Sequence, residues 1–335
     1  MSGSAPAAVF LDYETIHPVD LDGSVLTRLL PDMVVYPDTP HELLVERIGD
    51  AGIVLLNKVE LTREIIGKCP RLRLICLAAT GVDNVDVAAA KERGIGVVNI
   101  RNYCAPSVVQ HVFALLLALN QRLREYDELL AGGAWEQSTG FCVVDYPFRE
   151  LQGLTLGIVG LGNLGRRVAE VAQAFGMRVI AGQRPYSLES SGACTTGPDG
   201  IERALFADLL AQSHVISLHC PLTAETRGLI NATTLSLMQP GALLINTARG
   251  ALIVPDALIE ALRSGRLGGA GIDVLEREPP VHGHPFLDVS LRNLIVTPHM
   301  AWAARESRQR ALDEMALNVR DFLAGGQRNR VDLGV

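Results

Sequence analysis

The sequence predicts an α/β protein with two doubly wound, parallel-sheet (Rossmann-like) domains. Short runs rich in β-branched residues alternate with helical patterns along the whole chain, which is typical of parallel βαβ units. The alternation restarts after an irregular segment in the middle of the chain. A length of 335 residues is also more than one compact α/β unit needs and is enough for two.

The first part of the chain contains five predicted strands. They are Ala8–Tyr13, Met33–Tyr36, Gly52–Leu56, Leu72–Ala79 and Gly96–Ile100. Between them we expect helical stretches, among them His41–Ile48 and Val85–Arg93.

The second part contains six predicted strands, several of them apolar throughout, as strands buried on both faces should be. They are Leu154–Gly160, Met177–Ala181, His214–Cys220, Ala242–Thr247, Gly269–Val274 and Asn293–Thr297. The predicted helices are Leu164–Phe175, Ile201–Ala211, Asp256–Leu267 and, at the end of the chain, Ala304–Leu323.

A long helix and an irregular loop separate the two parts. Pro106 can open a helix, because proline is tolerated in the first turn, and apolar spacing continues to about Leu130. An irregular stretch then runs to about Glu150. A long helix followed by such a loop predicts a crossover between domains or an arm that contacts another subunit.

Composition argues against a nucleic-acid partner, a membrane span and a signal peptide. The net charge of −7, with no strong basic cluster, argues against nucleic acid. The most apolar stretch, Val108–Leu119, carries His111 and is too short to span a membrane, so we expect a buried helix and no membrane partner. Residues Met1–Ala8 have no basic region, so no signal peptide is expected.

The six cysteines are scattered, with no C-x-x-C pair and no metal-ligand spacing. They are Cys69, Cys76, Cys104, Cys142, Cys194 and Cys220. This pattern predicts reduced thiols, a cytoplasmic location and no metal site.

The segment Thr155–Gly165 combines a strand, a glycine-rich turn and the start of a helix. Gly160 is expected to make the turn, Gly162 to let a pyrophosphate approach the backbone, and Gly165 to let helix and strand pack closely. The N-terminus of the helix, at Asn163 and Leu164, would offer N–H groups to the phosphates. The context favours a dinucleotide site over a tight βα turn without a ligand.

The following strand indicates which dinucleotide is bound. An NAD site usually has an Asp or Glu about 20 residues after the glycine turn, which hydrogen-bonds the ribose hydroxyls. Here Gln183 and Arg184 take that place. A guanidinium can bind a 2′-phosphate, so we favour NADP over NAD, although Arg184 could also be a solvated surface residue.

Three later strand ends carry polar residues that could perform chemistry. Arg249 follows the strand at Ala242, Glu278 follows the strand at Gly269, and His299 follows the last strand. Ligands of open α/β sheets bind beyond the carboxyl ends of the strands, so these residues should lie at the same edge as the glycine turn. Together they provide a cation for a carboxylate substrate, an acid–base group and a carboxylate that tunes it.

At these residues the sequence resembles the D-isomer-specific 2-hydroxyacid dehydrogenases. Besides the glycine turn, the resemblance is carried by Ala79–Asp86, Ser217–Thr223, Asn246–Gly250, Asp273–Pro280 and Thr297–His299. It covers nearly the whole chain. Further segments are most similar to the glycerate dehydrogenase / hydroxypyruvate reductase branch: Leu56–Val59, Phe141–Pro147, Ala301–Trp302 and Glu306–Arg310.

The resemblance implies a role for each matching residue. Arg249 would bind the substrate carboxylate, His299 would be the general acid in reduction and base in oxidation, and Glu278 would favour the protonated imidazole. Asn57, Thr80 and Gly81 would contribute to substrate binding, the last two through backbone N–H groups. Asp273 would bind the nicotinamide amide, and the cofactor would also be lined by Cys220, Pro221, Thr226, Thr247 and Ala248.

The resemblance also implies a split substrate domain, residues 1–104 and 299–335, with the dinucleotide-binding domain, residues 105–298, inserted into it. Homodimers would form through the inserted domain and its long helix. The expected function is reduction of a small 2-keto acid, with hydroxypyruvate or glyoxylate favoured, to D-glycerate or glycolate. The alternative is a corepressor-like protein that senses a dinucleotide without turnover.

Overall fold

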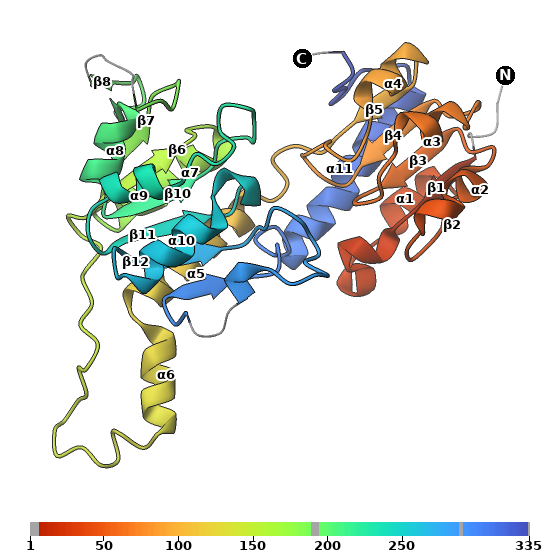
Figure 1. Ribbon diagram of the computed structural model, residues 1–335. Helices are drawn as coiled ribbons and strands as arrows, with labels where there is room; N and C mark the ends of the chain where they lie inside the picture. Colours follow the sequence, from red (N-terminus) through yellow and green to blue (C-terminus); the bar gives the residue numbers. More distant parts are fainter. Residues whose placement is uncertain (1–6, 189–193, 288–290, 334–335) are drawn as a thin grey trace. The chain divides into compact units, whose positions relative to one another are not determined.

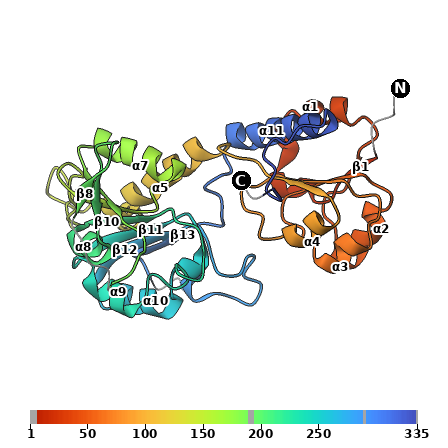
Figure 2. The same ribbon diagram turned by 90° about the horizontal axis from the view of Figure 1, so that it is seen from above.

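The computed structural model describes residues 7–188, 194–287 and 291–333, and it divides into two compact units. The first unit combines Met1–Cys104 with Trp302–Val335, and the second is Ala105–Ala301. Residues 1–6, part of the segment in which no signal peptide is expected, lie outside the described residues. Each unit is built on a sheet whose central strands are all parallel, with helices on both faces, which confirms the predicted fold class (Figures 1 and 2).

The first unit has a parallel sheet with the strand order β2-β1-β3-β4-β5. The strands are β1 Ala8–Phe10, β2 Val34–Val35, β3 Ile53–Leu56, β4 Leu74–Leu77 and β5 Gly96–Val98. The helices are α1 Ser24–Leu29, α2 Leu44–Ile48, α3 Arg63–Gly67, α4 Val87–Glu92 and α11 Arg305–Leu323. Figure 2 shows α1 and α11 on one face of the sheet and α2, α3 and α4 on the other. Short 3₁₀ turns lie at Tyr13–Ile16, Pro18–Asp20 and His41–Leu43.

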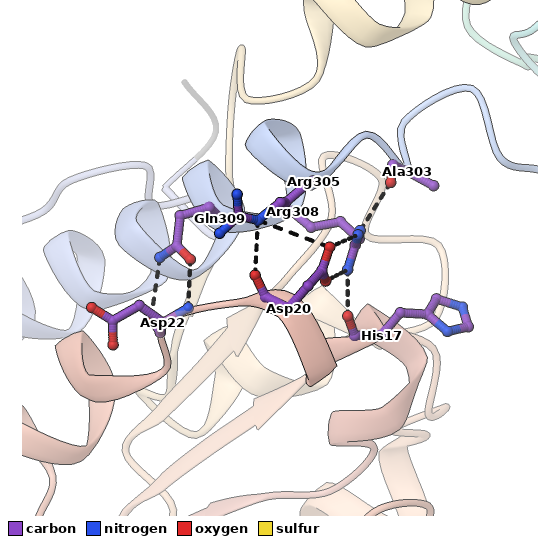
Figure 3. Close-up of polar contacts among 7 residues, drawn as sticks. All are labelled: His17, Asp20, Asp22, Ala303, Arg305, Arg308 and Gln309. Atoms are coloured by element: carbon purple, nitrogen blue, oxygen red, sulfur yellow. Dashed lines mark hydrogen bonds and ion pairs between the residues drawn. The ribbon is translucent and has the colours of Figure 1, made fainter.

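The C-terminal helix α11 is part of the first unit because it both packs and hydrogen-bonds there. Its apolar face, including Leu312 and Met315, is buried with residues of β1, β3 and β4. Its first turn is fastened to the segment 17–22, as Figure 3 shows: Arg308 donates two hydrogen bonds, 2.7 and 3.0 Å long, to the Asp20 carboxylate. Gln309 accepts from the N–H of Asp22 at 2.8 Å and donates to its carbonyl at 3.1 Å.

The second unit contains, among its described residues, an eight-stranded sheet of order β13-β12-β11-β10-β6-β7-β9-β8. The strands are β6 Thr155–Val159, β7 Arg178–Gly182, β8 Thr195–Thr196, β9 Glu202–Ala204, β10 Val215–Leu218, β11 Ala242–Asn246, β12 Leu267–Ile272 and β13 Leu294–Val296. Only the pairing of β8 with β9 is antiparallel within this sheet. From β6 the chain continues to β7, then forms β8 and β9 on the same side of the sheet, and finally returns to β10 on the other side of β6. Open α/β sheets bind ligands where the strand order reverses in this way, which here is at the carboxyl ends of β6 and β10.

Helices cover both faces of the second sheet. They are α5 Ala105–Asn120, α6 Leu123–Ala131, α7 Asn163–Ala174, α8 Phe206–Gln212, α9 Ala232–Leu237 and α10 Pro255–Arg263. Short 3₁₀ turns lie at Gly250–Leu252 and Pro285–Leu287. Figure 2 shows α5 and α7 on one face and α8, α9 and α10 on the other, and Figure 1 shows that α6 and the loop after it project from this unit. In the described part of the chain, the helices are too short or too polar to cross a bilayer.

Two expectations about secondary structure are wrong. The predicted helix Ile201–Ala211 begins as strand β9, because Glu202–Ala204 pairs with β7, and only Phe206–Gln212 is helical. The helix predicted from Pro106 to about Leu130 is broken where Arg122 has a positive φ of 54°, so that α5 and α6 are separate. No helix was predicted at α3 or α9. Thr62 and Asn231 cap the N-termini of these helices, and capping residues of this kind can be recognised in a sequence.

Candidate active site

The glycine turn joins β6 to α7 at the point where the strand order reverses. Gly160 has a φ of +105°, and a Cβ atom there would lie 2.5 Å from the backbone nitrogen of Cys220. A Cβ on Gly165 would lie 2.3 Å from the carbonyl oxygen of Gly160. Both positions therefore require glycine because backbone occupies the space of a side chain.

Gly162 differs from its two neighbours in the motif. A Cβ at this position would meet nothing within 4 Å. The protein itself leaves open the space into which the pyrophosphate of a dinucleotide is expected to fit. Helix α7 begins at the next residue, Asn163, and no side chain caps its N-terminus, so the first-turn N–H groups and the positive end of the helix dipole are directed to this space.

The segment after β10 lies against the glycine turn, with His219 and Cys220 next to Gly160. Burial raises the pKa of the Cys220 thiol to about 11 and lowers the pKa of the His219 imidazole to about 4, so both are neutral at pH 7. Thr226, expected to line the cofactor, uses its hydroxyl within the following turn. That hydroxyl donates to the carbonyl of Pro221 at 2.7 Å and accepts from the N–H of Thr223 at 2.8 Å.

Thr247 has a buried hydroxyl that no other described residue hydrogen-bonds. Its Oγ1 is buried and, among the described residues, is the one buried side-chain nitrogen or oxygen without a hydrogen-bond partner. Leaving a buried hydroxyl unpaired costs about 1–3 kcal/mol. Thr247 directly follows β11, at the carboxyl edge of the sheet, so a ligand bound there can supply the missing partner.

Gln183 and Arg184 follow β7 as predicted, but only Arg184 has an exposed side chain. The Gln183 amide donates to the carbonyl of Arg203 at 3.2 Å and to the hydroxyl of Thr195 at 3.4 Å, which ties it to β9 and β8. Burial raises the pKa of the Tyr186 phenol, and a hydrogen bond with Arg184 partly offsets this increase. Arg184 comes two residues after the end of β7. The ribose of a dinucleotide would be expected at this strand end.

His299 and Glu278 form a direct pair. Nδ1 of His299 lies 2.5 Å from Oε2 of Glu278, and each side chain is about one-third exposed, 33% and 32% respectively. The other carboxylate oxygen of Glu278 accepts a hydrogen bond from the N–H of Leu275 at 2.7 Å. Because Nδ1 faces the carboxylate, Nε2 is the nitrogen through which the imidazole can exchange a proton with a substrate.

Asp273, which follows β12, holds the loop that carries His299. Its Oδ1 accepts from the Thr297 hydroxyl at 2.6 Å and from the N–H of Met300 at 2.9 Å, and its Oδ2 accepts from the N–H of Ala301 at 2.9 Å. The N–H of His299 donates to the Asp273 carbonyl at 2.8 Å. These bonds fix His299 in a left-handed backbone conformation with φ of +53°, which is rare for residues other than glycine.

The charge of Asp273 is stabilised by the same contacts. Burial raises the pKa of this carboxyl, but hydrogen bonds from His111, Thr297 and the N–H groups of the loop outweigh burial and hold the pKa below its ordinary value. Asp273 is therefore ionised at pH 7. No role was predicted for His111, although a histidine within the apolar stretch Val108–Leu119 was a signal that such a partner existed.

Arg249 lies after β11 on a loop that packs against the segment before Glu278. Its Nη1 donates to the carbonyl of Ala248 at 2.8 Å. The side chain of Asn246 shapes the loop by accepting from the N–H of Ala248 at 3.0 Å and donating to the carbonyl of Arg249 at 2.9 Å. A Cβ on Gly250 would lie 2.0 Å from the carbonyl carbon of Leu275, so the two loops are in backbone contact.

Asn57, Thr80 and Gly81 belong to the first unit, at the carboxyl ends of β3 and β4. The Asn57 amide donates to the Thr15 hydroxyl at 3.0 Å, and the Thr80 hydroxyl donates to the carbonyl of Ile100 at 2.9 Å. The backbone N–H groups of Thr80 and Gly81 donate no hydrogen bond within the described residues. These two donors are therefore available to an anion.

Asp12 is a buried residue near Asn57 for which no role was predicted from the sequence. Its carboxylate accepts hydrogen bonds from the backbone N–H groups of Asn57, Lys58 and Val59 at 2.8, 2.5 and 3.0 Å. Burial nevertheless raises its pKa above the ordinary value. Asp12 determines the path of the loop that carries Asn57.

The described residues hold no cluster of His, Cys, Asp or Glu that could bind a metal ion. All six cysteines lie among the described residues and are free thiols.

Comparisons with known proteins agree with this geometry. Residues 113–301 match the family of the D-isomer specific 2-hydroxyacid dehydrogenase, NAD binding domain. The glycerate dehydrogenase of Methylorubrum extorquens is 44% identical over 97% of this chain and 98% of the relative. The hydroxypyruvate reductase of Blautia hydrogenotrophica is 39% identical over 97% and 99%. The crystal structure of D-lactate dehydrogenase from Aquifex aeolicus, complexed with NAD and lactic acid, is 30% identical, with a TM-score of 0.82 over 97% of this chain and 99% of that one.

Fold, site and comparisons together define a nicotinamide-dependent oxidoreductase with two Rossmann-type domains. The chain belongs to the D-isomer specific 2-hydroxyacid dehydrogenase family, which confirms the resemblance inferred from its motifs. It transfers a hydride between a nicotinamide dinucleotide and a 2-keto or 2-hydroxy acid. The non-enzymatic alternative receives no support.

The open space at Gly162 leads to a paired prediction. Gly162→Ala should leave the melting temperature of the protein unchanged and weaken cofactor binding at least tenfold, because only the ligand needs that space. Gly160→Ala should weaken binding too but also destabilise the protein, since its Cβ overlaps backbone. Thermal unfolding and calorimetric titration with the reduced cofactor measure both effects. Unchanged cofactor affinity in Gly162→Ala would rule out the proposed pyrophosphate position.

Proposed function

We propose that this protein is an NADPH-preferring reductase of small 2-keto acids, with hydroxypyruvate or glyoxylate as the favoured substrate and D-glycerate or glycolate as the product. The observation that carries the proposal is the His299–Glu278 pair, 2.5 Å apart, at the same sheet edge as the glycine turn. The similarity to a glycerate dehydrogenase and a hydroxypyruvate reductase over nearly the whole chain supports this substrate class.

Three catalytic roles are proposed for the second unit. The Arg249 guanidinium binds the substrate carboxylate and polarises the 2-keto oxygen. His299 donates a proton from Nε2 to that oxygen during reduction and withdraws it during oxidation. Glu278 holds Nδ1, which fixes the orientation of the ring and balances the charge of the imidazolium. The bound nicotinamide supplies the hydride in reduction.

The cofactor is proposed to be held along the carboxyl edge of the second sheet. Gly160, Gly162 and Gly165, with the N–H groups at Asn163 and Leu164, would bind the pyrophosphate. The hydroxyl of Thr247, which has no hydrogen-bond partner among the described residues, fits a hydrogen bond to the cofactor, beside Ala248, Cys220 and Pro221. A carboxylate has about four acceptor sites, so Oδ2 of Asp273 can accept a nicotinamide amide in addition to the N–H of Ala301.

The first unit is proposed to contribute to substrate binding. The N–H groups of Thr80 and Gly81, which lack partners among the described residues, are suited to a carboxylate. Asn57 would contribute from a loop whose position is fixed by its hydrogen bonds to Asp12. We also retain, as a proposal, a substrate domain of residues 1–104 and 299–335 around a cofactor domain of residues 105–298; the second compact unit of the structure extends to Ala301 and so includes His299. The cytoplasmic location inferred from the scattered cysteines is likewise a proposal.

A panel of 2-keto acids tests the proposed function. Purified protein is mixed with NADPH or NADH and each acid, and the absorbance of the reduced cofactor is followed. Turnover should be fastest with hydroxypyruvate or glyoxylate. Arg249→Gln should raise the KM for the acid about 10- to 150-fold, as expected for a lost hydrogen bond to a charged group, without changing the Kd of the cofactor. Absence of turnover with every acid would overturn the proposal.

Arg184 provides a test of the cofactor preference. Arg184→Ala should raise the KM for NADPH by about 10- to 150-fold and leave the KM for NADH nearly unchanged, because only NADPH has the 2′-phosphate. Arg178→Ala is a matched control, since Arg178 is exposed at the opposite end of the same strand. Equal effects of Arg184→Ala on both cofactors would show that this residue does not bind the phosphate.

We further propose that the protein is a homodimer whose contact includes the arm formed by α6 and residues 132–150. Large apolar side chains of the arm are exposed in the single chain: Phe141 by 96%, Val144 by 72%, Trp135 by 55% and Phe148 by 52%. A second copy of the chain would bury them.

Analytical ultracentrifugation tests this dimer. Replacing Phe141 and Val144 by Ser should shift the protein toward monomer, because the contact loses its apolar anchors. Val281→Ser removes an equally exposed apolar residue, 71% accessible, elsewhere in the second unit and should leave the assembly unchanged. A wild-type protein that sediments as a monomer would contradict the proposed dimer.

A further inference from the structure

His111 lies on α5 and contacts the loop that carries His299. Its side chain is only 14% exposed, and Nε2 lies 2.9 Å from Oγ1 of Thr297 and 3.4 Å from Oδ1 of Asp273. Four residues earlier on the same helix face, the hydroxyl of Ser107 donates to the carbonyl of Ala301 at 2.6 Å. One face of α5 therefore contacts both ends of the segment from Thr297 to Ala301.

The hydrogen-bond directions in this cluster follow from the chemistry of the groups. An ionised carboxylate only accepts, so the Thr297 hydroxyl must direct its hydrogen to Asp273, 2.6 Å away. Toward His111 that hydroxyl can then only accept. Nε2 of His111 must therefore carry a proton, and the chain of donors runs from His111 through Thr297 to Asp273.

The loop that carries His299 has a strained backbone, and hydrogen bonds are needed to hold it. His299 has a φ of +53°, and it keeps this conformation because the N–H groups of His299, Met300 and Ala301 all donate to Asp273. Asp273 itself is 1% exposed, and a buried carboxylate stays ionised only when enough donors surround it. His111 is the side chain from a separate element that completes this set.

We propose that His111 is a positioning residue for the catalytic acid: through Thr297 and Asp273 it fixes the backbone that orients His299 toward Glu278 and the substrate. This inference rests on the proposed role of His299. Ser107 assists by holding the carbonyl of Ala301. A merely structural role, in which His111 only fills space in the core of the unit, predicts a loss of stability without a specific loss of turnover.

Kinetics of matched variants distinguish these two roles. His111→Leu keeps the volume but removes the donor, and Thr297→Val removes the hydroxyl with little change of shape. Each should lower kcat about 10- to 100-fold while the KM for the 2-keto acid changes less than threefold, because the proton donor is misplaced but Arg249 is untouched. His111→Gln, which restores an N–H donor, should recover most of the activity. Val112→Ala, at the adjacent buried position of α5, is the control for stability.

A double-variant experiment tests whether His111 acts through His299. In the His299→Ala background, His111→Leu should cause no further loss of the residual rate, since the residue that it positions is already absent. The proposal is overturned if His111→Leu lowers kcat no more than Val112→Ala does, or if the two losses multiply independently.

Hydrogen exchange provides a readout that requires no turnover. In the substrate-free protein, amides of residues 299–301 should exchange at least tenfold faster in His111→Leu than in wild type or Val112→Ala. If the wild type reduces none of the acids, the proposed function fails while this result still decides whether His111 holds the loop. Unchanged exchange at residues 299–301 would overturn the inference even in an active enzyme.

Discussion

The buried carboxylate of Asp273 is the group on which the geometry of the active site depends. It lies at the end of β12 and accepts hydrogen bonds from the Thr297 hydroxyl and from the backbone of Met300 and Ala301. An ionised carboxylate that is almost wholly buried would be costly without such donors, so the chain after β13 has to wrap around it. As a consequence, His299 adopts an unusual backbone conformation and its imidazole meets Glu278.

Close contacts between loop backbones position the other parts of the site. At the reversal of strand order, Gly160 lies against the backbone of Cys220, and a Cβ on Gly162 would meet nothing within 4 Å. On the neighbouring strands, Gly250 lies against Leu275, which brings the loop of Arg249 to the segment that ends in Glu278. The parallel sheet thus places a nucleotide-binding turn and an acid–base pair at one edge, and glycines at two contacts allow the loops to meet there.

Much of this arrangement could be predicted from the sequence because it depends on local patterns. The alternation of apolar strands with helices predicted both doubly wound sheets, and the family was recognised from its motifs. The helix expected at Ile201–Ala211 failed because pairing with β7, a tertiary contact, makes its first residues a strand. The break at Arg122 has no proline or glycine to mark it, and so spacing alone could not reveal it.

The supporting residues of the site were harder to predict than the residues that perform chemistry. Nothing in the sequence shows that the Thr247 hydroxyl is buried and lacks a partner in the described part of the chain, because this depends on several loops at once. Similarly, His111 is 186 residues away from Thr297 in the chain, and only the fold brings them together. Thr226 remains a predicted cofactor contact, and the hydrogen bond of its hydroxyl to the carbonyl of Pro221 also depends on the folded turn.

Chemical rescue of His299→Ala tests the central claim, that the loop held by Asp273 positions an imidazole as the proton donor. The account predicts that kcat for reduction falls about 10²- to 10⁴-fold, that the Kd of the reduced cofactor is unchanged, and that added imidazole restores part of the rate in proportion to its concentration. A variant that turns over at the wild-type rate, or whose lost activity imidazole does not restore while cofactor binding is intact, would contradict it.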